Sequence, residues 1–171
     1  TGRRWPIVDG RPVFTKDGRD VHCHAVDHVS NPLPRSALHL IEGSEGPVLN
    51  LSGGASSCCF DHVVEAEYSL FRTTDVAADA HHLPFKDSAF DLVVCLNAFE
   101  HYREPTAVAA EIRRVLRPGG KVFIHTAFMQ PLHEAPYHYF NCTKYGLEEW
   151  LRIFDIDYIH VSANLNPAYA F

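Results

Sequence analysis

The sequence has no long hydrophobic run, no cluster of basic residues and no paired cysteine motif. Its apolar stretches stay short of the roughly 18 residues that a membrane-spanning helix needs, so we expect no membrane segment. The net charge is -6 and the Lys and Arg residues are scattered, which argues against a nucleic-acid groove. The sequence opens polar, with Arg3 and Arg4, so we expect no secretory signal. The five cysteines lack CxxC spacing, which favours a reducing, cytoplasmic setting.

Histidine is plentiful, but its pattern does not predict a metal site. His22, Cys23, His24 and His28 are close in sequence and offer side chains of the kinds that bind metal ions. On an extended strand, however, successive side chains point to opposite faces, so the His-Cys-His triplet could not easily share one ion. We therefore expect no bound metal.

The length and composition indicate a single globular domain with a short N-terminal appendage. At 171 residues and 46% hydrophobic content, the chain can bury a proper core. Within residues 1–30, Asp9 and Gly10 form a turn signal between two apolar segments, which predicts a hairpin whose prolines favour edge strands. Residues 31–171 are expected to form the main domain. Because the chain begins with Thr, excision from a longer polypeptide is an open expectation.

Hydrophobic strand patterns alternate with helical ones through the main domain. Strands are expected over residues 47–51, 62–67, 74–78, 90–96, 121–127 and 156–162. Helices are expected over 37–42 with Ser36 as cap, over 104–116 ending at Pro118-Gly119-Gly120, and over 146–154 with Thr143 as cap. This order predicts an α/β fold with a doubly wound, mostly parallel, Rossmann-like sheet. The connection between Ser57 and His62 is too short for a normal crossover helix.

Polar residues follow several of the expected strands at their carboxyl ends. In parallel sheets these ends meet at one edge, where ligands bind. Gly53 and Gly54 in the loop 52–57 would let the backbone approach a ligand closely, although a plain tight turn is the alternative. Glu67 ends the second strand, where an acidic residue typically takes the hydroxyls of a ribose, or else is a solvated charge. Glu65 is a rival that lies further inside the strand.

Three further candidates follow the later strands. Asp79-Ala80 could offer a carboxylate to an exocyclic amine and Leu83 an apolar wall for a ring, while a turn held by the Asp side chain is the alternative. Asn97 and His101 follow the most hydrophobic strand. His101 could be a base or simply begin the next turn. His133, in a loop rich in Pro and Tyr, could deprotonate a hydroxyl or merely pack.

The combined segments resemble class I S-adenosylmethionine-dependent methyltransferases of the type-11 group. The resemblance is carried by residues 79–85, 90–94, 100–101, 111–120 and 133–140, and covers roughly residues 46–155. The chain is most similar to a branch found with polysaccharide and glycosyltransferase functions, where the first crossover is equally short. The resemblance implies S-adenosylmethionine as cofactor. It assigns the cofactor's methionine part to residues 50–56, its ribose to Glu67 and its adenine to Asp79 and Ala80.

The glycine loop departs from the family pattern Asp-x-Gly-x-Gly-x-Gly. Asn50 replaces the acid, Ser52 the first glycine and Ser56 the last, and only Gly54 stands in register. Losing the Asp removes a charge-assisted contact worth up to about 3 kcal/mol where it is buried. The departures therefore bear on cofactor affinity rather than on fold.

We therefore expect S-adenosylmethionine-dependent methyl transfer to a small hydroxylated or glycan-type acceptor. The expected cofactor contacts are Asn50, Ser52, Gly53, Gly54, Ala55, Glu67, Asp79, Ala80, Leu83 and Asn97, with His101 and His133 as base candidates. The alternative is a catalytically inactive methyltransferase-like binding module of a longer polypeptide. A nicotinamide-dependent enzyme is disfavoured because no Gly-x-Gly-x-x-Gly occurs. The sequence does not indicate an oligomeric state.

Overall fold

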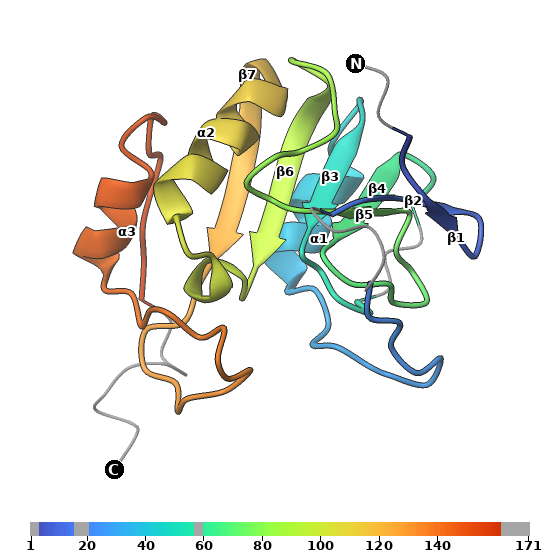
Figure 1. Cartoon of the computed structure of the whole chain (residues 1–171). Helices are drawn as coiled ribbons and strands as arrows, with labels where there is room; N and C mark the ends of the chain where they lie inside the picture. Colours follow the sequence, from blue (N-terminus) through green and yellow to red (C-terminus); the bar gives the residue numbers. More distant parts are fainter. Residues whose placement is uncertain (1–3, 16–20, 57–59, 162–171) are drawn as a thin grey trace.

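The centre of the molecule is one twisted sheet (Figure 1). The structure, a computed structural model, describes residues 4–15, 21–56 and 60–161, and within them seven strands lie in the order β1-β2-β5-β4-β3-β6-β7. Five adjacent strands run parallel, as predicted: β3 (Val48–Leu51), β4 (Val63–Glu67), β5 (Val76–Ala78), β6 (Phe90–Leu96) and β7 (Leu116–His125). The predicted α/β, mostly parallel architecture is confirmed.

The N-terminal hairpin extends this sheet. Strands β1 (Ile7–Val8) and β2 (Arg11–Phe14) pair antiparallel around Asp9 and Gly10, whose φ angles of 49° and 78° suit the predicted tight turn. The prediction that both are edge strands is wrong for β2, which also pairs parallel with β5. Its ladder to β5 uses Val13 and Phe14, so Pro12, which has no N–H to donate, is not needed there.

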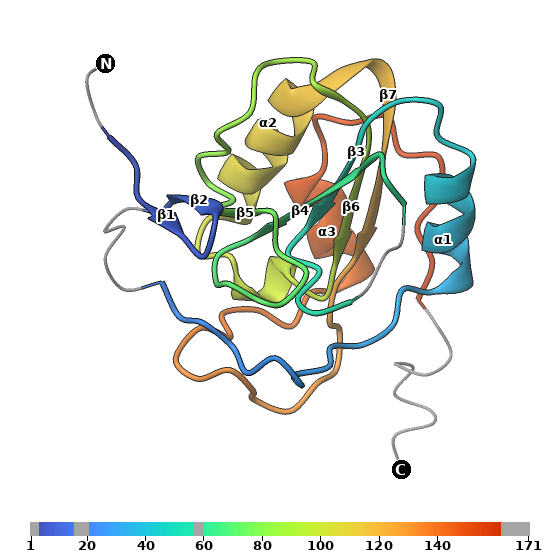
Figure 2. The same cartoon turned by 90° about the vertical axis from the view of Figure 1, so that its right-hand side faces the viewer.

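Helices cover both faces of the sheet (Figure 2). On one face, α1 (Arg35–Glu42) buries Ala37 and Ile41 against strands β3 and β6. On the other face lie α2 (Pro105–Val115), α3 (Lys144–Trp150) and the short 3-10 helix η1 (Phe99–His101). This second face holds the larger core, in which the wholly buried Phe99 and Ile112 are central.

Several predicted boundaries are wrong. Helix α1 is preceded by Pro34 and has no side-chain cap, so Ser36 lies inside its first turn instead of capping it. Helix α2 ends at Val115, before Pro118-Gly119-Gly120, because the chain pairs with β6 from Leu116 onward. Residues 156–161 form no strand, since no described strand pairs with them.

Some other expectations are confirmed, and some concern residues that the structure does not describe. Thr143 caps α3 as predicted, its Oγ1 accepting a hydrogen bond from the Gly146 amide at 3.1 Å. Cys23, Cys95 and Cys142 are free thiols, whereas Ser57, Cys58, Cys59 and Ser162 lie outside the described residues. In the described part of the chain, no helix has both the length and the apolar character to span a bilayer.

The connections on the α1 side are short. No helix occurs in residues 52–56 and 60–62 between β3 and β4, nor in residues 68–75 between β4 and β5. The sequence predicted the first of these omissions but not the second. Loops instead of helices therefore follow the carboxyl ends of β3 and β4 in the described part of the chain.

Candidate functional site

The carboxyl ends of the parallel strands form one edge of the sheet, at the bottom of Figure 1. The loop after β3, Glu67 at the end of β4, Asp79 after β5, Asn97 after β6 and the loop after β7 all start from this edge. This is where doubly wound sheets bind ligands. The structure thus places the sequence-predicted residues on a common edge, and their individual contacts show which of them face one another.

Asn50 forms a buried pair with Glu65. The two residues are register partners on neighbouring strands, and Asn50 Nδ2 donates to Glu65 Oε2 at 2.7 Å. Burial raises the pKa of Glu65 to about 8, against the opposing effect of the Asn50 hydrogen bond, and the nearby Asp75 and Glu67 raise it further. An Asp at position 50 would set a second carboxylate against this one. An amide thus stands at position 50, where the neighbouring strand carries a buried carboxyl of its own.

The two serines that replace loop glycines also have local partners. Ser52 has a φ of 59°, a left-handed conformation that favours glycine, and its hydroxyl lies 2.8 Å from the buried Tyr102 hydroxyl. The hydroxyl of Ser56 donates to the Gly53 carbonyl at 2.5 Å. Each departure from the glycine motif is therefore matched by a hydrogen bond within this chain.

The glycines make room for the protein's own side chains. A Cβ on Gly53 would lie 2.3 Å from Asn50 Nδ2, and a Cβ on Gly54 would lie 2.3 Å from Ser30 Oγ. The Ala55 amide donates to this same Ser30 oxygen at 2.8 Å. Ser30 belongs to the segment before α1, which therefore lies directly on the loop. Sequence reasoning missed this contact because nothing local marks Ser30 as a partner of a loop that follows 25 residues later.

Glu67 fastens the other side of the loop. Its Oε1 accepts a hydrogen bond from the Gly54 amide at 2.5 Å, and its Oε2 accepts one from the Tyr68 amide at 3.1 Å. Burial raises the pKa of Glu67 to about 7, although these two amides oppose the shift. Each carboxylate oxygen can accept a second hydrogen bond, so the carboxylate still fits the two hydroxyls of a ribose.

Asp79 stands at the end of the neighbouring strand β5. Its Oδ1 accepts hydrogen bonds from the His81 amide at 2.9 Å and from His81 Nδ1 at 2.7 Å. Partial burial raises the pKa of Asp79, but the contacts with His81 outweigh it and leave the pKa below its ordinary value. A charged carboxylate here fits an exocyclic amine. The side chains of Ala80 and Leu83 are buried in the main core, and Glu111 holds the Leu83 amide at 2.8 Å.

Asn97 links the ends of β6 and β7. Its backbone has a φ of 52°, its amide donates to the His125 carbonyl at 2.8 Å, and its Oδ1 lies 2.7 Å from His125 Nδ1. With its side chain and its amide both directed to His125, Asn97 fixes the start of the segment that carries His101.

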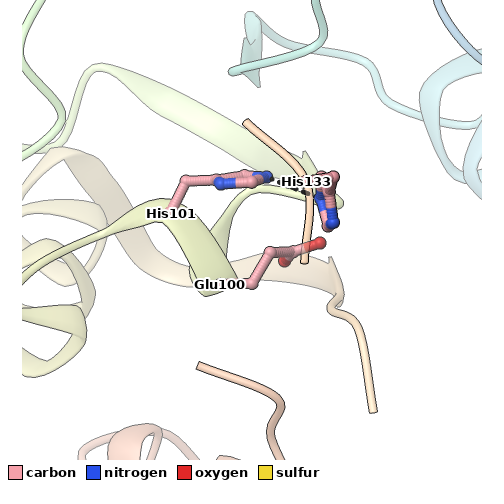
Figure 3. A group of neighbouring side chains, drawn as sticks. All are labelled: Glu100, His101 and His133. Atoms are coloured by element: carbon pink, nitrogen blue, oxygen red, sulfur yellow. Dashed lines mark hydrogen bonds between the residues drawn. The ribbon is translucent and has the colours of Figure 1, made fainter. Parts of the chain in front are cut away.

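The two base candidates meet in space (Figure 3). His101 Nε2 and His133 Nε2 lie 3.2 Å apart, although 32 positions separate the residues in the chain. Beside them lies Glu100, whose side chain is wholly buried; its Oε2 accepts a hydrogen bond from the Thr126 hydroxyl at 2.9 Å. Glu100 was not among the predicted site residues. Its signal was a charged residue directly after the apolar pair Ala98-Phe99 and next to the base candidate His101.

Comparison with known proteins places these features in a family context. Residues 49–124 match the family described as "Methyltransferase domain". Over 68 residues the chain is 34% identical to the ubiquinone biosynthesis O-methyltransferase of Xanthomonas oryzae pv. oryzae; the match covers 40% of this chain and 26% of that protein. Matches to the first curated relatives span only about a quarter of the relatives' length, from 21% to 26%.

Solved structures share the fold at low identity. The [4+2]-cyclase SpnF superposes with a TM-score of 0.54 and 22% identity, over 70% of this chain and 56% of that one. The phosphoethanolamine N-methyltransferase 2 of Haemonchus contortus, solved in complex with S-adenosylmethionine, gives a TM-score of 0.51 and 19% identity, over 70% of this chain and 36% of that one. S-adenosylmethionine is the cofactor of this family. Residues 49–124 of this chain are thus similar to the methyltransferase domain family, and the solved structures share its fold.

Proposed function

We propose that this protein transfers a methyl group from S-adenosylmethionine to a hydroxyl oxygen of a small or glycan-type acceptor. The observation that carries the proposal is the position of Glu67, a strand-end carboxylate that also holds the glycine loop through the Gly54 amide. Asp79, on the adjacent strand end, adds a second carboxylate with a lowered pKa. Two acids on neighbouring strand ends suit an adenosine, whose ribose and exocyclic amine both donate hydrogen bonds.

In this proposal the cofactor, when bound, supplies an activated methyl group. Glu67 accepts hydrogen bonds from ribose hydroxyls, Asp79 accepts one from the adenine amine, and the loop 50–56 orients the remainder. Positioning of the acceptor supplies most of the rate, as expected for a displacement that needs no covalent help from the protein.

The acceptor oxygen must lose a proton as it gains the methyl group. His101 and His133 each direct Nδ1 toward a backbone carbonyl, of Tyr137 at 3.1 Å and of Pro131 at 3.0 Å respectively. Because a carbonyl only accepts, both Nδ1 atoms carry the hydrogen and each neutral ring keeps a lone pair on Nε2. The paired Nε2 atoms therefore form the proton-accepting end of the site, and we assign the hydroxyl acceptor to their side.

A second candidate function, a non-catalytic binding module, is favoured by the closed state of the loop. The amides of Gly54 and Ala55 already donate to Glu67 and Ser30, so they are occupied by the chain itself. The fold alone does not decide, because it also supports other chemistry, as the cyclase shows.

Calorimetric titration with S-adenosylmethionine, S-adenosylhomocysteine and NAD separates these functions. We expect the first two to bind and NAD not to bind. Glu67→Gln should weaken binding about 10- to 100-fold, because it removes charge-assisted hydrogen bonds worth roughly 1.5–3 kcal/mol. The less buried Asp79→Asn is the second variant should Glu67→Gln fold poorly, and Glu45→Gln, at an exposed position, is the matched control.

The outcomes lead to different conclusions. Binding of both sulfur compounds that Glu67→Gln weakens and Glu45→Gln preserves supports the proposal. If the folded protein binds none of the three, the non-catalytic module is correct. Binding of NAD alone would overturn both readings. Release of S-adenosylhomocysteine with a panel of phenols, sugars and oligosaccharides then identifies the acceptor.

A further inference from the structure

We propose that Glu100, His101 and His133 bind a divalent transition-metal ion, for which zinc is the best match to the donor atoms. Their ligating atoms all lie within 4.8 Å of one another, and they form the one such group of three His, Cys, Asp or Glu residues in the part of the chain that the structure describes. Figure 3 shows the three side chains pointing toward a common point from η1 and from the loop after β7.

The distance between the two imidazoles matches a shared ion. Their Nε2 atoms are 3.2 Å apart. Two imidazole nitrogens bound to zinc at about 2.0–2.1 Å, with a tetrahedral angle between them, are about 3.3–3.4 Å apart. Two His and one carboxylate, with a further position for a solvent or substrate oxygen, form a common donor set for such ions.

The orientation of the rings requires something between them. Both Nδ1 atoms donate to backbone carbonyls, so both Nε2 atoms present lone pairs to each other. Two lone pairs at this separation repel unless a proton or a metal ion lies between them. Donation of the second ring N–H to a backbone carbonyl is also the usual arrangement of histidines that bind metals.

Glu100 supplies a second, independent observation. The side chain is fully buried, its Oε2 is held by Thr126, and its Oε1 has no hydrogen-bond partner among the described residues. A buried carboxylate that lacks a partner is costly, and a neighbouring cation removes the cost. A shared proton between the two rings would use neither this oxygen nor the convergence of all three groups.

The neighbouring His138 shows what a purely structural histidine looks like here. Its ring lies 4.2 Å from that of His133, yet its Nδ1 accepts from the His133 amide at 3.3 Å and its Nε2 faces the Phe140 carbonyl at 3.1 Å. Both nitrogens of His138 are therefore satisfied by the backbone. His101 and His133 differ because one nitrogen of each remains directed at the other ring.

A bound ion would also take part in the proposed methyl transfer, and only this part of the inference rests on the proposed function. The imidazoles would then hold the ion instead of taking the proton themselves. An acceptor hydroxyl on the open position would lose its proton more easily, as water bound to zinc does. Metal binding itself does not depend on the cofactor, so the two proposals can fail separately.

The test is metal binding by the full chain without cofactor. Chelator-treated protein is titrated with Zn²⁺ against a coloured chelator, and with Co²⁺ to follow the visible absorption of a low-coordinate site. We expect one equivalent per chain. His101→Gln and His133→Gln should each weaken binding at least about 100-fold, and Thr126→Val about 10-fold as a supporting residue. His39→Gln, at an exposed position on α1, and His24→Gln, in the N-terminal histidine group, should leave the affinity unchanged.

Melting curves of the metal-free variants establish which of them fold. If His101→Gln does not fold, the His133→Gln variant, whose substitution lies on a loop, provides the test. The proposal is overturned if the folded protein takes up no stoichiometric Zn²⁺. It is also overturned if both histidine variants bind as well as the parent, or if His39→Gln or His24→Gln loses as much affinity as they do.

Discussion

Replacing Glu65 by Gln should make the protein more stable at alkaline pH and leave it unchanged at acidic pH. Glu65 is buried beside Asn50, and burial raises its pKa from an ordinary value of 4.5 to about 8. In the unfolded chain the carboxyl ionises near 4.5, well before it does in the folded protein. The unfolded state is therefore favoured progressively as the pH rises from about 4.5 to about 8.

The magnitude follows from the pKa difference. One pKa unit corresponds to about 1.4 kcal/mol, so the stability lost across this window is roughly 3–5 kcal/mol. Gln keeps the shape of the side chain and an oxygen that can accept the Asn50 hydrogen bond, but it does not ionise. The variant should therefore equal the parent below about pH 4.5, exceed it by about 2 kcal/mol near pH 6, and reach the full gain above about pH 8.

Urea denaturation followed by far-ultraviolet circular dichroism at several pH values measures this gain. Glu45→Gln, at an exposed position, is the control and should show no such pH-dependent gain. A Glu65→Gln variant that is less stable than the parent at pH 8, or whose gain does not grow with pH, would refute the reasoning. Glu67, whose pKa is raised to about 7, should also make both proteins less stable as the pH rises, by a smaller amount.

Three other predictions follow from the packing of the same elements. Asn50→Asp introduces the acid of the Asp-x-Gly-x-Gly-x-Gly pattern but places a second carboxyl beside Glu65. In urea denaturation it should therefore lower the free energy of unfolding by about 2–4 kcal/mol at pH 8 and by much less at pH 4. An unchanged stability at pH 8 would contradict the pairing. Ile112→Ala, at a wholly buried position of α2, should lower the free energy of unfolding by about 2–5 kcal/mol. Ile153→Ala, at an exposed position, should lower it by less than about 1 kcal/mol, and equal losses would contradict the assigned core. Ser52→Gly relieves a left-handed backbone and loses the Tyr102 hydrogen bond, so the two effects should nearly cancel, to within about 1 kcal/mol, in thermal melts.

The strands could be predicted because their apolar runs are nearly continuous. Phe90–Leu96 was located to the residue, since both faces of β6 are covered and every position but two is buried. The transition from α2 to β7 was misplaced because Pro-Gly-Gly is a strong local stop signal. Tertiary pairing of Leu116 with Phe90 prevails over that signal and starts the strand earlier. The parallel ladder of β2 with β5 joins residues about 64 positions apart, and nothing local records it.

The site could be predicted in outline for the same reason that the sheet could. Residues at strand ends share an edge whenever the strands are parallel, so Glu67, Asp79 and Asn97 could be placed there from order alone. Their partners could not be predicted. Tyr102 and Ser30 matter because of where the fold brings them, and each is in sequence an ordinary core or turn residue. Glu65 was identified as a rival of Glu67, but its pairing with Asn50 was not predicted.

Each of the three departures from the glycine motif makes a hydrogen bond within the chain. Ser52 bonds to Tyr102, Ser56 to the Gly53 carbonyl, and Asn50 donates to Glu65, while Asn50 Oδ1 and Glu65 Oε1 have no partner among the described residues. A loop held in this way costs little ordering entropy when a ligand binds. It also has fewer free amides to offer, because two of them already donate to Glu67 and Ser30. Cofactor affinity should therefore depend less on the loop than on the two strand-end acids, which is why variants of Glu67 and Asp79 test the proposed function most directly.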